Sequence, residues 1–164
     1  MFKGMFSQEM KKKIFESCIL PILTYGAQTW TPTERQLIRL ARTQIAMERS
    51  IIGLKRKDRV SNLAVRRKSK IIDCRYIIKK LKMDYAGHPA RREEGRWEKK
   101  VLDWQPRGMK RKVGRPKLRW EDEIIQTGGI AWGRSARNRE CWEWVGEAYA
   151  QGWAHDGSGD AGDT

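Results

Sequence analysis

The chain has 164 residues and a formal net charge of +15, and its 39% hydrophobic and 34% charged residues allow one domain with a lean core, or one domain with a tail. Its three cysteines are odd in number and far apart, which excludes a disulfide framework and a Cys-x-x-Cys metal knuckle. No apolar run reaches transmembrane length, so we expect a reduced, intracellular protein that does not enter a membrane.

Positive charge is concentrated in one half of the chain. Residues 35–119 contain 28 Lys and Arg against 8 Asp and Glu, a net charge of +20, whereas residues 120–164 carry −6 and residues 1–34 carry +1. A field of one sign over half a chain attracts polyanions. Well-solvated basic faces without any ligand would show the same composition.

The first predicted helix begins near Ser7 and ends at Gly26. Pro21 should kink this helix, because proline removes a backbone donor. Helical spacing predicts an apolar side made of Ile14, Phe15, Cys18, Ile19, Ile22 and Leu23.

The second predicted helix has the clearest start signal. Thr31 can cap it, Pro32 suits its first position and Glu34 completes a capping box, while Gly53 ends it. Opposite a basic solvent face, its apolar side is predicted to contain Leu37, Leu40, Ala41, Ile45, Ile51 and Ile52.

The middle of the chain predicts shorter elements. A basic turn with a cap at Asp58 leads into a short helix around Leu63. A helix over residues 71–82 follows, with Ile71, Cys74, Ile78 and Leu81 inside. Residues 87–95 are expected to form a loop, and a short helix then carries Trp97, Val101 and Trp104.

The last third predicts two more helices. One starts near Pro116, places Trp120 and Ile124 on one face and ends at Gly128. The other spans residues 135–151 and buries Cys141, Trp142, Val145 and Tyr149. Residues 154–164 are rich in Gly and Asp and should be disordered. The fold class is therefore predicted to be all-α, an irregular assembly of about six to seven helices.

Catalytic residues are hard to find in this sequence. The one acidic cluster, at residues 121–123, lies in the first turns of a predicted helix, where it complements the helix dipole. His88, between Gly87 and Pro89, is expected to be a loop residue rather than a base. We therefore expect no enzymatic activity from the chain alone, and no metal or other cofactor.

Nucleic-acid binding has better support, because clustered cations can follow a phosphate backbone. Trp97, Trp104, Trp120 and Trp142 are expected to pack in the core rather than stack on bases. The predicted contacts are Lys55, Arg56, Lys57, Arg59, Arg66, Arg67, Lys68, Lys70, Arg91, Arg92, Lys110, Arg111, Lys112, Arg115, Lys117 and Arg119.

The segment Gly114-Arg115-Pro116 stands within the last of these clusters. It is similar to the AT-hook, a short motif whose extended arginine lies in the minor groove of A·T-rich DNA. Three interpretations remain open at this point: minor-groove insertion, phosphate binding without sequence preference, and a plain turn leading into the next helix.

An ordered set of segments resembles the region that follows the polymerase core in the endonuclease–reverse transcriptases of non-LTR retrotransposons. The resemblance covers residues 7–153. The segments are PILTYGAQTW, the basic run over residues 56–67, YAGHPARR, RWEKKVLDWQP, VGRPKLRWEDEI and AWGRSARNRECWEWVGEAYAQGW.

This resemblance implies thumb-like helices over residues 1–53 and a basic helical extension over 54–153, whereas the acidic tail over 154–164 has no counterpart in the family. It implies a grip on RNA or DNA through the backbone, and a nuclear location. The magnesium-binding aspartates of the polymerase palm and the Cys/His knuckle of some relatives have no counterpart here. Relatives usually carry an apolar residue where Pro89 follows His88, so no role is transferred to that histidine.

Three hypotheses follow. The favoured one is a nucleic-acid-gripping fragment of a reverse transcriptase without its own catalytic centre. The second is a host-adopted DNA-binding module that uses the Gly114-Arg115-Pro116 arm. The third is a partly unfolded, non-functional remnant of an element. The choice between RNA and DNA, and the oligomeric state, stay open.

Overall fold

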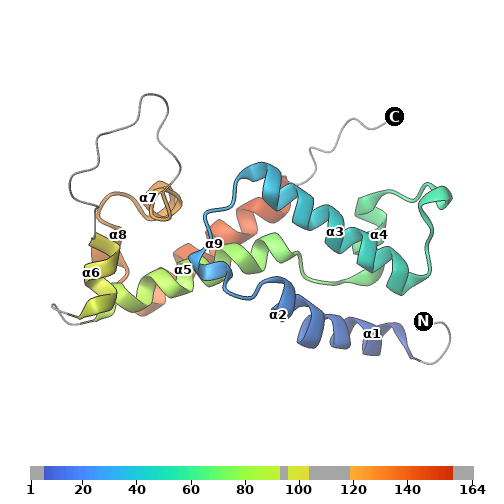
Figure 1. Ribbon diagram of the computed structural model, residues 1–164, viewed down its shortest axis with the longest axis horizontal. Coiled ribbons are helices and arrows are strands. Elements are labelled where there is room, and N and C mark those ends of the chain that lie inside the picture. Colours follow the sequence, from blue (N-terminus) through green and yellow to red (C-terminus); the bar gives the residue numbers. More distant parts are fainter. Residues whose placement is uncertain (1–5, 93–95, 104–118, 157–164) are drawn as a thin grey trace. The chain divides into compact units, whose positions relative to one another are not determined.

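The computed structural model describes residues 6–92, 96–103 and 119–156, with the side chains of 101–103 and 153–156 left out (Figure 1). Every regular element in these ranges is a helix, which confirms the predicted all-α class. The α-helices are α1 (Gln8–Ile14), α2 (Leu20–Leu23), α3 (Glu34–Ile52), α4 (Asn62–Ser69), α5 (Cys74–Arg91), α6 (Trp97–Asp103), α7 (Asp122–Gly128), α8 (Trp132–Ser135) and α9 (Arg139–Asp156). The shorter turns are η1 (Phe15–Ile19), η2 (Ala27–Thr29) and η3 (Arg56–Asp58). No helix in the described ranges is long and apolar enough to cross a bilayer.

The chain divides into two compact units. The N-terminal unit comprises residues 1–27, 32–78 and 153–164, and the C-terminal unit comprises residues 28–31 and 79–152. The division by resemblance at residues 53 and 153 stays a prediction. α9 continues to Asp156, so the predicted disordered tail was wrong for its first three residues, and residues 157–164 lie outside the described ranges.

A π-helical turn sets the inward face of the first helix. The Leu20 N–H donates to the Phe15 carbonyl, five residues earlier, directly before Pro21. Because a π turn advances the chain by one extra residue, Leu20 follows Phe15 into the core, at 2% and 0% exposure. The predicted inward positions of Cys18, Ile19 and Ile22 were therefore wrong, and these side chains are exposed.

α3 begins two residues later than its sequence signal predicts. Thr33 is the N-cap, and its backbone N–H donates to the Gln36 side chain at 2.7 Å, so the capping box is Thr33–Gln36 rather than Thr31–Glu34. The predicted stop is confirmed, since Gly53 adopts a left-handed conformation with φ 83°. The α3 helix then contributes to the core of the N-terminal unit, where Phe15, Leu20, Ile71 and Cys74 are buried together.

Two different side chains cap α4 and the turn before it. The Ser61 hydroxyl, not Asp58, caps α4 by accepting the Ala64 N–H at 3.2 Å. Asp58 instead closes η3, because its carboxylate accepts the Lys55 N–H at 2.6 Å. Arg59 and Lys70 end η3 and α4 in left-handed conformations, at φ 50° and 52°. The Leu63 side chain is exposed.

The C-terminal unit has an aromatic core. Trp132 and Trp142 pack with ring centroids 5.9 Å apart, together with Met83, Ala86 and Ile124. The Trp142 indole N–H also donates to the Met83 carbonyl at 2.7 Å. Gly87 allows this approach, because a Cβ there would stand 2.8 Å from the Trp142 ring.

The predicted loop over residues 87–95 was wrong at its start. α5 continues through Gly87, His88 and Pro89 to Arg91, because this last segment packs on the tryptophan core. The Arg91 guanidinium then donates to the Ala136 carbonyl at 3.0 Å. Tertiary contacts thus outweigh the helix-disrupting tendency of proline.

The predicted burial of the tryptophans and of Cys141 needs correction. Trp142 is buried and Trp120 half-buried, but Trp97 is 79% exposed, and Trp104 lies outside the described residues. α7 starts at Asp122, so Trp120 precedes it rather than sharing its helical face with Ile124. Cys141 is exposed. The helix that carries it, α9, begins at Arg139 rather than at residue 135, and the Asn138 side chain accepts the Cys141 N–H at 3.1 Å just before this start.

Candidate nucleic-acid interface

A buried polar seam holds α3 to the start of α5 in the N-terminal unit. The Gln44 side chain is fully buried and forms two 2.7 Å hydrogen bonds, accepting the Cys74 N–H and donating to the Ile72 carbonyl. One turn further along, buried Glu48 accepts the Ser69 hydroxyl at 2.6 Å. The spacing of apolar residues along α3 did not predict that Gln44 and Glu48 are buried, because both side chains are polar.

Arg66 belongs to this seam rather than to the free surface. Its guanidinium is 3.0 Å from the Asp73 carboxylate, which Arg75 also contacts at 2.8 Å. Burial would raise the pKa of Asp73, but hydrogen bonds from Arg75 and the charge of Arg66 outweigh it and lower this pKa. Asp73 therefore stays ionised, and Arg66 serves mainly to hold α4 against the start of α5.

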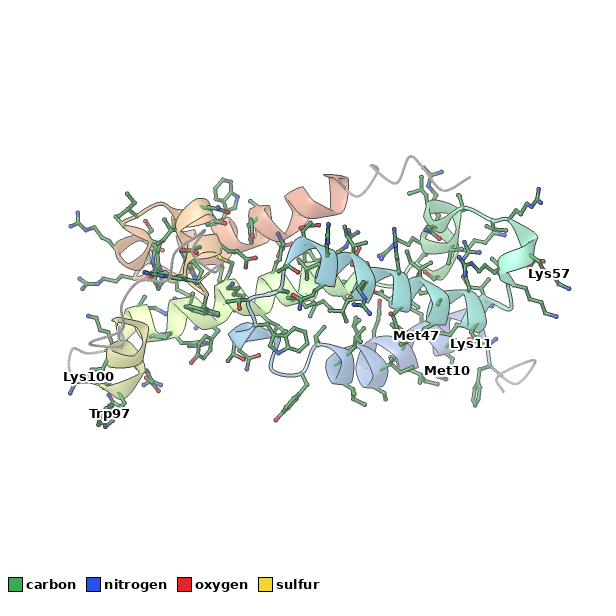
Figure 2. All side chains as sticks on the ribbon, turned by 45° about the horizontal axis from the view of Figure 1, so that its top comes forward. Met10, Lys11, Met47, Lys57, Trp97 and Lys100 are labelled. Carbon is green, nitrogen blue, oxygen red and sulfur yellow. The ribbon has the colours of Figure 1, made fainter. Side chains whose placement is uncertain are left out.

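Seven of the predicted contacts form an exposed group in the N-terminal unit, which we call the basic edge. They come from η3 and α4 and the residues next to them (Figure 2, where Lys57 is labelled). None forms an ion pair with a described Asp or Glu side chain. The basic edge consists of Lys55, Arg56, Lys57, Arg59, Arg67, Lys68 and Lys70.

α3 adds a second row of cations to the same unit. Arg35, Arg39 and Arg42 are exposed and follow one another at helical spacing. They lie away from Leu37 and Ala41, which face the core. The amphipathic pattern predicted a basic face here, but these three arginines were not among the predicted contacts.

The predicted contacts of the C-terminal unit are less available. Arg91 is half-buried and bonded to the Ala136 carbonyl, and Arg92 lies 3.5 Å from the Glu98 carboxylate. Arg119 is exposed, while its backbone N–H donates to Asp122 at 2.6 Å. The remaining contacts, which lie outside the described residues together with the Gly114-Arg115-Pro116 arm, are Lys110, Arg111, Lys112, Arg115 and Lys117.

The acidic cluster at the start of α7 has structural partners. Glu123 pairs with buried Lys82 at 2.6 Å, and Glu121 accepts the Trp132 indole N–H at 2.9 Å. Asp122 caps the turn at Arg119. These contacts agree with the predicted structural role of the cluster. Within the described ranges, no group of three His, Cys, Asp or Glu side chains could hold a metal ion.

The thiol of Cys74 is poorly suited to nucleophilic chemistry. Burial, with a smaller contribution from the neighbouring Asp73 carboxylate, raises its pKa to about 12. The thiol therefore stays protonated at neutral pH, while its backbone N–H is held by Gln44. Cys74 acts as a core residue.

These features define a basic, all-α protein whose N-terminal unit exposes a group of cations on and next to α3, η3 and α4. Over 121 residues, the chain is 34% identical to an uncharacterized transposon-derived protein of Caenorhabditis elegans. The match covers 71% of this chain and 43% of that protein, so the chain spans less than half the length of this relative. The similarity supports an origin in a transposable element. No protein-family model and no solved structure matches the chain.

Proposed function

We propose that the chain binds RNA or DNA through the phosphate backbone, as the thumb and C-terminal part of a non-LTR retrotransposon reverse transcriptase. The observation that carries this proposal is the basic edge, whose seven exposed cations form no ion pair with a described carboxylate. A cation already paired to a carboxylate must lose that partner before it binds phosphate. Unpaired cations bind without that cost.

The scaffold beneath the basic edge supports the proposal. Ser61 caps α4, Asp58 closes η3, and Arg49 donates to the Val60 carbonyl and to Asn62 between them. These bonds hold the connection between α3 and α4 in one conformation. Cations on such a connection lose less freedom on binding than cations on a flexible arm.

The chemistry of the basic edge favours binding without sequence preference. Lysine ammonium groups and arginine guanidinium groups both contact phosphate oxygens, which carry no sequence information. The row of Arg35, Arg39 and Arg42 extends the same chemistry along α3. The proposal assigns no catalytic step to this chain, and nucleotide incorporation by the purified protein would contradict it.

Salt dependence tests the proposal directly. Affinity for an RNA–DNA hybrid should fall on the order of a hundredfold or more between low and physiological salt, because bound phosphates release counterions. The triple variant Lys55→Gln/Arg56→Gln/Lys57→Gln should bind more weakly and lower the slope of log affinity against log salt by about 2–3.

A matched control removes the same charge elsewhere. Lys12, Lys80 and Arg139 each pair with a glutamate, at 3.8, 2.5 and 2.8 Å. The variant Lys12→Gln/Lys80→Gln/Arg139→Gln should keep most of the affinity. Equal losses in both triple variants would reduce the effect to net charge and contradict a defined surface.

Two further outcomes would favour the other hypotheses. A preference for A·T-rich over G·C-rich duplex, lost in Arg115→Ala, would support a minor-groove arm. A broad, non-cooperative loss of helix on heating, without salt-dependent binding, would support a non-functional remnant.

A further inference from the structure

Trp97 is 79% exposed, more than any other tryptophan that the structure describes, although indole is a large apolar group. Three other tryptophans of the C-terminal unit anchor the fold, because their indole N–H groups donate to carbonyl or carboxylate oxygens at 2.6, 2.9 and 2.7 Å: Trp120, Trp132 and Trp142. The Trp97 indole N–H forms no hydrogen bond within the described residues. Trp97 therefore contributes little to the packing of the C-terminal unit.

One side of α6 combines this aromatic ring with two exposed cations, Arg96 and Lys100. The Lys100 N–H donates to the Arg96 carbonyl at 3.2 Å, so Arg96 belongs to the first turn of the helix. Because an α-helix turns by about 100° per residue, Lys100 lies about 60° and Arg96 about 100° from Trp97, in the same direction around the helix axis. The Lys100 ammonium is 5.3 Å from the Trp97 ring centroid (Figure 2, where both residues are labelled).

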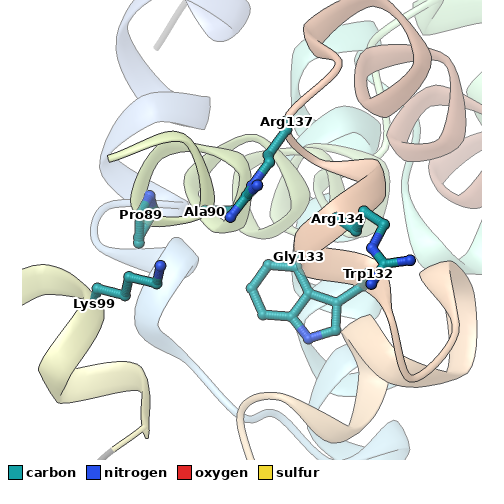
Figure 3. Close-up of a pocket in the computed structure, with 7 residues that line it drawn as sticks. All are labelled: Pro89, Ala90, Lys99, Trp132, Gly133, Arg134 and Arg137. Atoms are coloured by element: carbon teal, nitrogen blue, oxygen red, sulfur yellow. The ribbon is translucent and has the colours of Figure 1, made fainter. Parts of the chain in front are cut away.

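The other sides of α6 are held by neighbouring helices. The Glu98 carboxylate is 3.5 Å from the Arg92 guanidinium, directly after α5. Lys99 lines a pocket together with residues of α5 and α8, and Figure 3 shows it beside Pro89 at the end of α5. Lys99 is two residues from Trp97 and therefore points to the opposite side of the helix. These contacts leave the Trp97 side of α6 facing solvent.

A second exposed tryptophan, Trp144 on α9, has a negative charge near it instead. It is 72% exposed, and the exposed carboxylate of Glu140 lies one turn before it. A carboxylate repels the phosphates of any strand that approaches this ring. Arg96 and Lys100 form no ion pair with a described carboxylate, so their charges near Trp97 attract the same phosphates.

We propose that Trp97 stacks on an unpaired base of single-stranded RNA or DNA, while Arg96 and Lys100 contact the phosphates next to that base. Proteins that bind single strands combine cations along the backbone with aromatic rings on which the bases stack. Both kinds of group occur together on the exposed side of α6. This inference rests on the proposed function and deepens it, because it adds a contact with bases to the contacts with phosphate.

A stacking site of this kind should distinguish single strands from duplexes. In a duplex each base is already stacked and paired, so an outside ring reaches it only after the base has been unstacked, which costs free energy. Stacking is also tolerant of sequence, because every base has a π face. We therefore expect a preference for single strands, with little preference among the bases.

Binding of a short oligodeoxyadenylate to the full chain, measured by fluorescence anisotropy, tests the proposal. An oligomer of the same length made of abasic residues keeps the phosphates but lacks the bases, so it should bind more weakly. Trp97→Ala should lower the affinity for oligodeoxyadenylate about tenfold, the effect of one lost stacking contact, and leave the affinity for the abasic oligomer unchanged. Trp97→Phe should retain most of the affinity, because phenylalanine keeps an aromatic ring.

The matched control is Trp144→Ala, which removes a similarly exposed indole and should bind both oligomers like the original chain. Lys100→Gln should weaken the binding of both oligomers alike, because it removes a phosphate contact. Equal losses in Trp97→Ala and Trp144→Ala would overturn the proposal, as would an unchanged affinity of Trp97→Ala for oligodeoxyadenylate. So would a dimer of the chain that Trp97→Ala dissociates without changing either affinity, since Trp97 would then join two copies. Circular dichroism confirms that each variant is folded.

Failure of this proposal is distinguishable from failure of the proposed function. The Lys55→Gln/Arg56→Gln/Lys57→Gln variant should lose affinity for the RNA–DNA hybrid and keep the difference in affinity between oligodeoxyadenylate and the abasic oligomer. Trp97→Ala should reduce that difference and keep its affinity for the hybrid. Salt-dependent binding of the hybrid, without any difference between the two oligomers, would retain the role of the basic edge and overturn the stacking site.

Discussion

Two buried lysines of the C-terminal unit contrast with the exposed cations of the basic edge. In the N-terminal unit the seven cations of the basic edge face solvent, whereas Lys79 and Lys82 in the C-terminal unit are only 5% and 2% exposed. Lys82 pairs with Glu123, and Lys79 lies 4.4 Å from the Tyr149 ring centroid, with its ammonium 3.1 Å from the phenol oxygen. Positive charge in the sequence therefore does not by itself measure the cationic surface that a polyanion can reach.

The two units also bury different kinds of polar group. The N-terminal unit buries Gln44 and Glu48, which are joined to backbone and hydroxyl groups. The C-terminal unit buries ammonium groups against a carboxylate and aromatic rings. Loss of one partner should therefore cost most in the C-terminal unit, where a full charge would be left behind.

The largest expected effect is that of Glu123→Ala. It leaves the Lys82 ammonium buried without its carboxylate partner, which should lower the free energy of unfolding by about 3–5 kcal/mol. Urea unfolding followed by circular dichroism measures this change. The double variant Lys82→Met/Glu123→Ala should recover most of the loss, and a cost below about 1 kcal/mol for Glu123→Ala would show that Lys82 can reach water.

The next largest effect is expected for Gln44→Leu in the N-terminal unit. Leucine fills similar space but leaves the buried Cys74 N–H and the Ile72 carbonyl without their partner. The free energy of unfolding should fall by about 2–4 kcal/mol. Gln36→Leu at the exposed start of α3 is the control, and it should cost about 1 kcal/mol or less, the value of a helix cap. Equal costs for both would argue against the buried seam.

The Glu48→Gln variant is expected to be more stable than the original chain, by an amount that depends on pH. Burial raises the pKa of Glu48 in the folded chain, although the Ser69 hydrogen bond and the Arg66 charge oppose it. Folding thus favours the protonated form of Glu48. The stability that this form contributes is lost as the pH rises through the raised pKa. The neutral glutamine should make the chain more stable at pH 8, with the difference disappearing below the ordinary glutamate pKa of about 4.3.

Asp73→Asn, in the same polar seam, should change the stability of the chain in the opposite direction. The pKa of Asp73 is lowered, so its ionised form stabilises the fold above its ordinary pKa of about 3.9, and this stability is lost as the pH falls. The asparagine variant should be less stable at neutral pH. Identical pH profiles of stability for the two variants would contradict the opposite roles of these carboxyl groups.

The smallest effect on stability is expected at the basic edge itself. Each of Lys55→Gln, Arg56→Gln and Lys57→Gln should change the free energy of unfolding by less than about 0.5 kcal/mol, because these side chains are exposed and unpaired. Urea unfolding of the single variants checks this expectation. A cost above about 1 kcal/mol would mean that the turn depends on these cations for its structure.

Local signals in the sequence were sufficient for the helical class and for several element boundaries. Ser7 caps α1, Gly53 ends α3 with positive φ, and Trp142 is buried as its spacing predicts. Each of these depends on residues within a turn or two, whose backbone preferences are the same in any fold. The basic turn before α4 could likewise be predicted from the sequence, because exposed clusters of charge need no distant partner.

Tertiary structure decided the features that depend on partners far apart in the chain. Gln44 meets Cys74, 30 residues away, and Lys82 meets Glu123, 41 residues away. The same holds for the helical end of α5, where packing of Gly87 on Trp142 overrides the local tendency of Pro89. A polar or charged side chain enters the core only where such a partner offsets its desolvation, and no local pattern records which partner that will be.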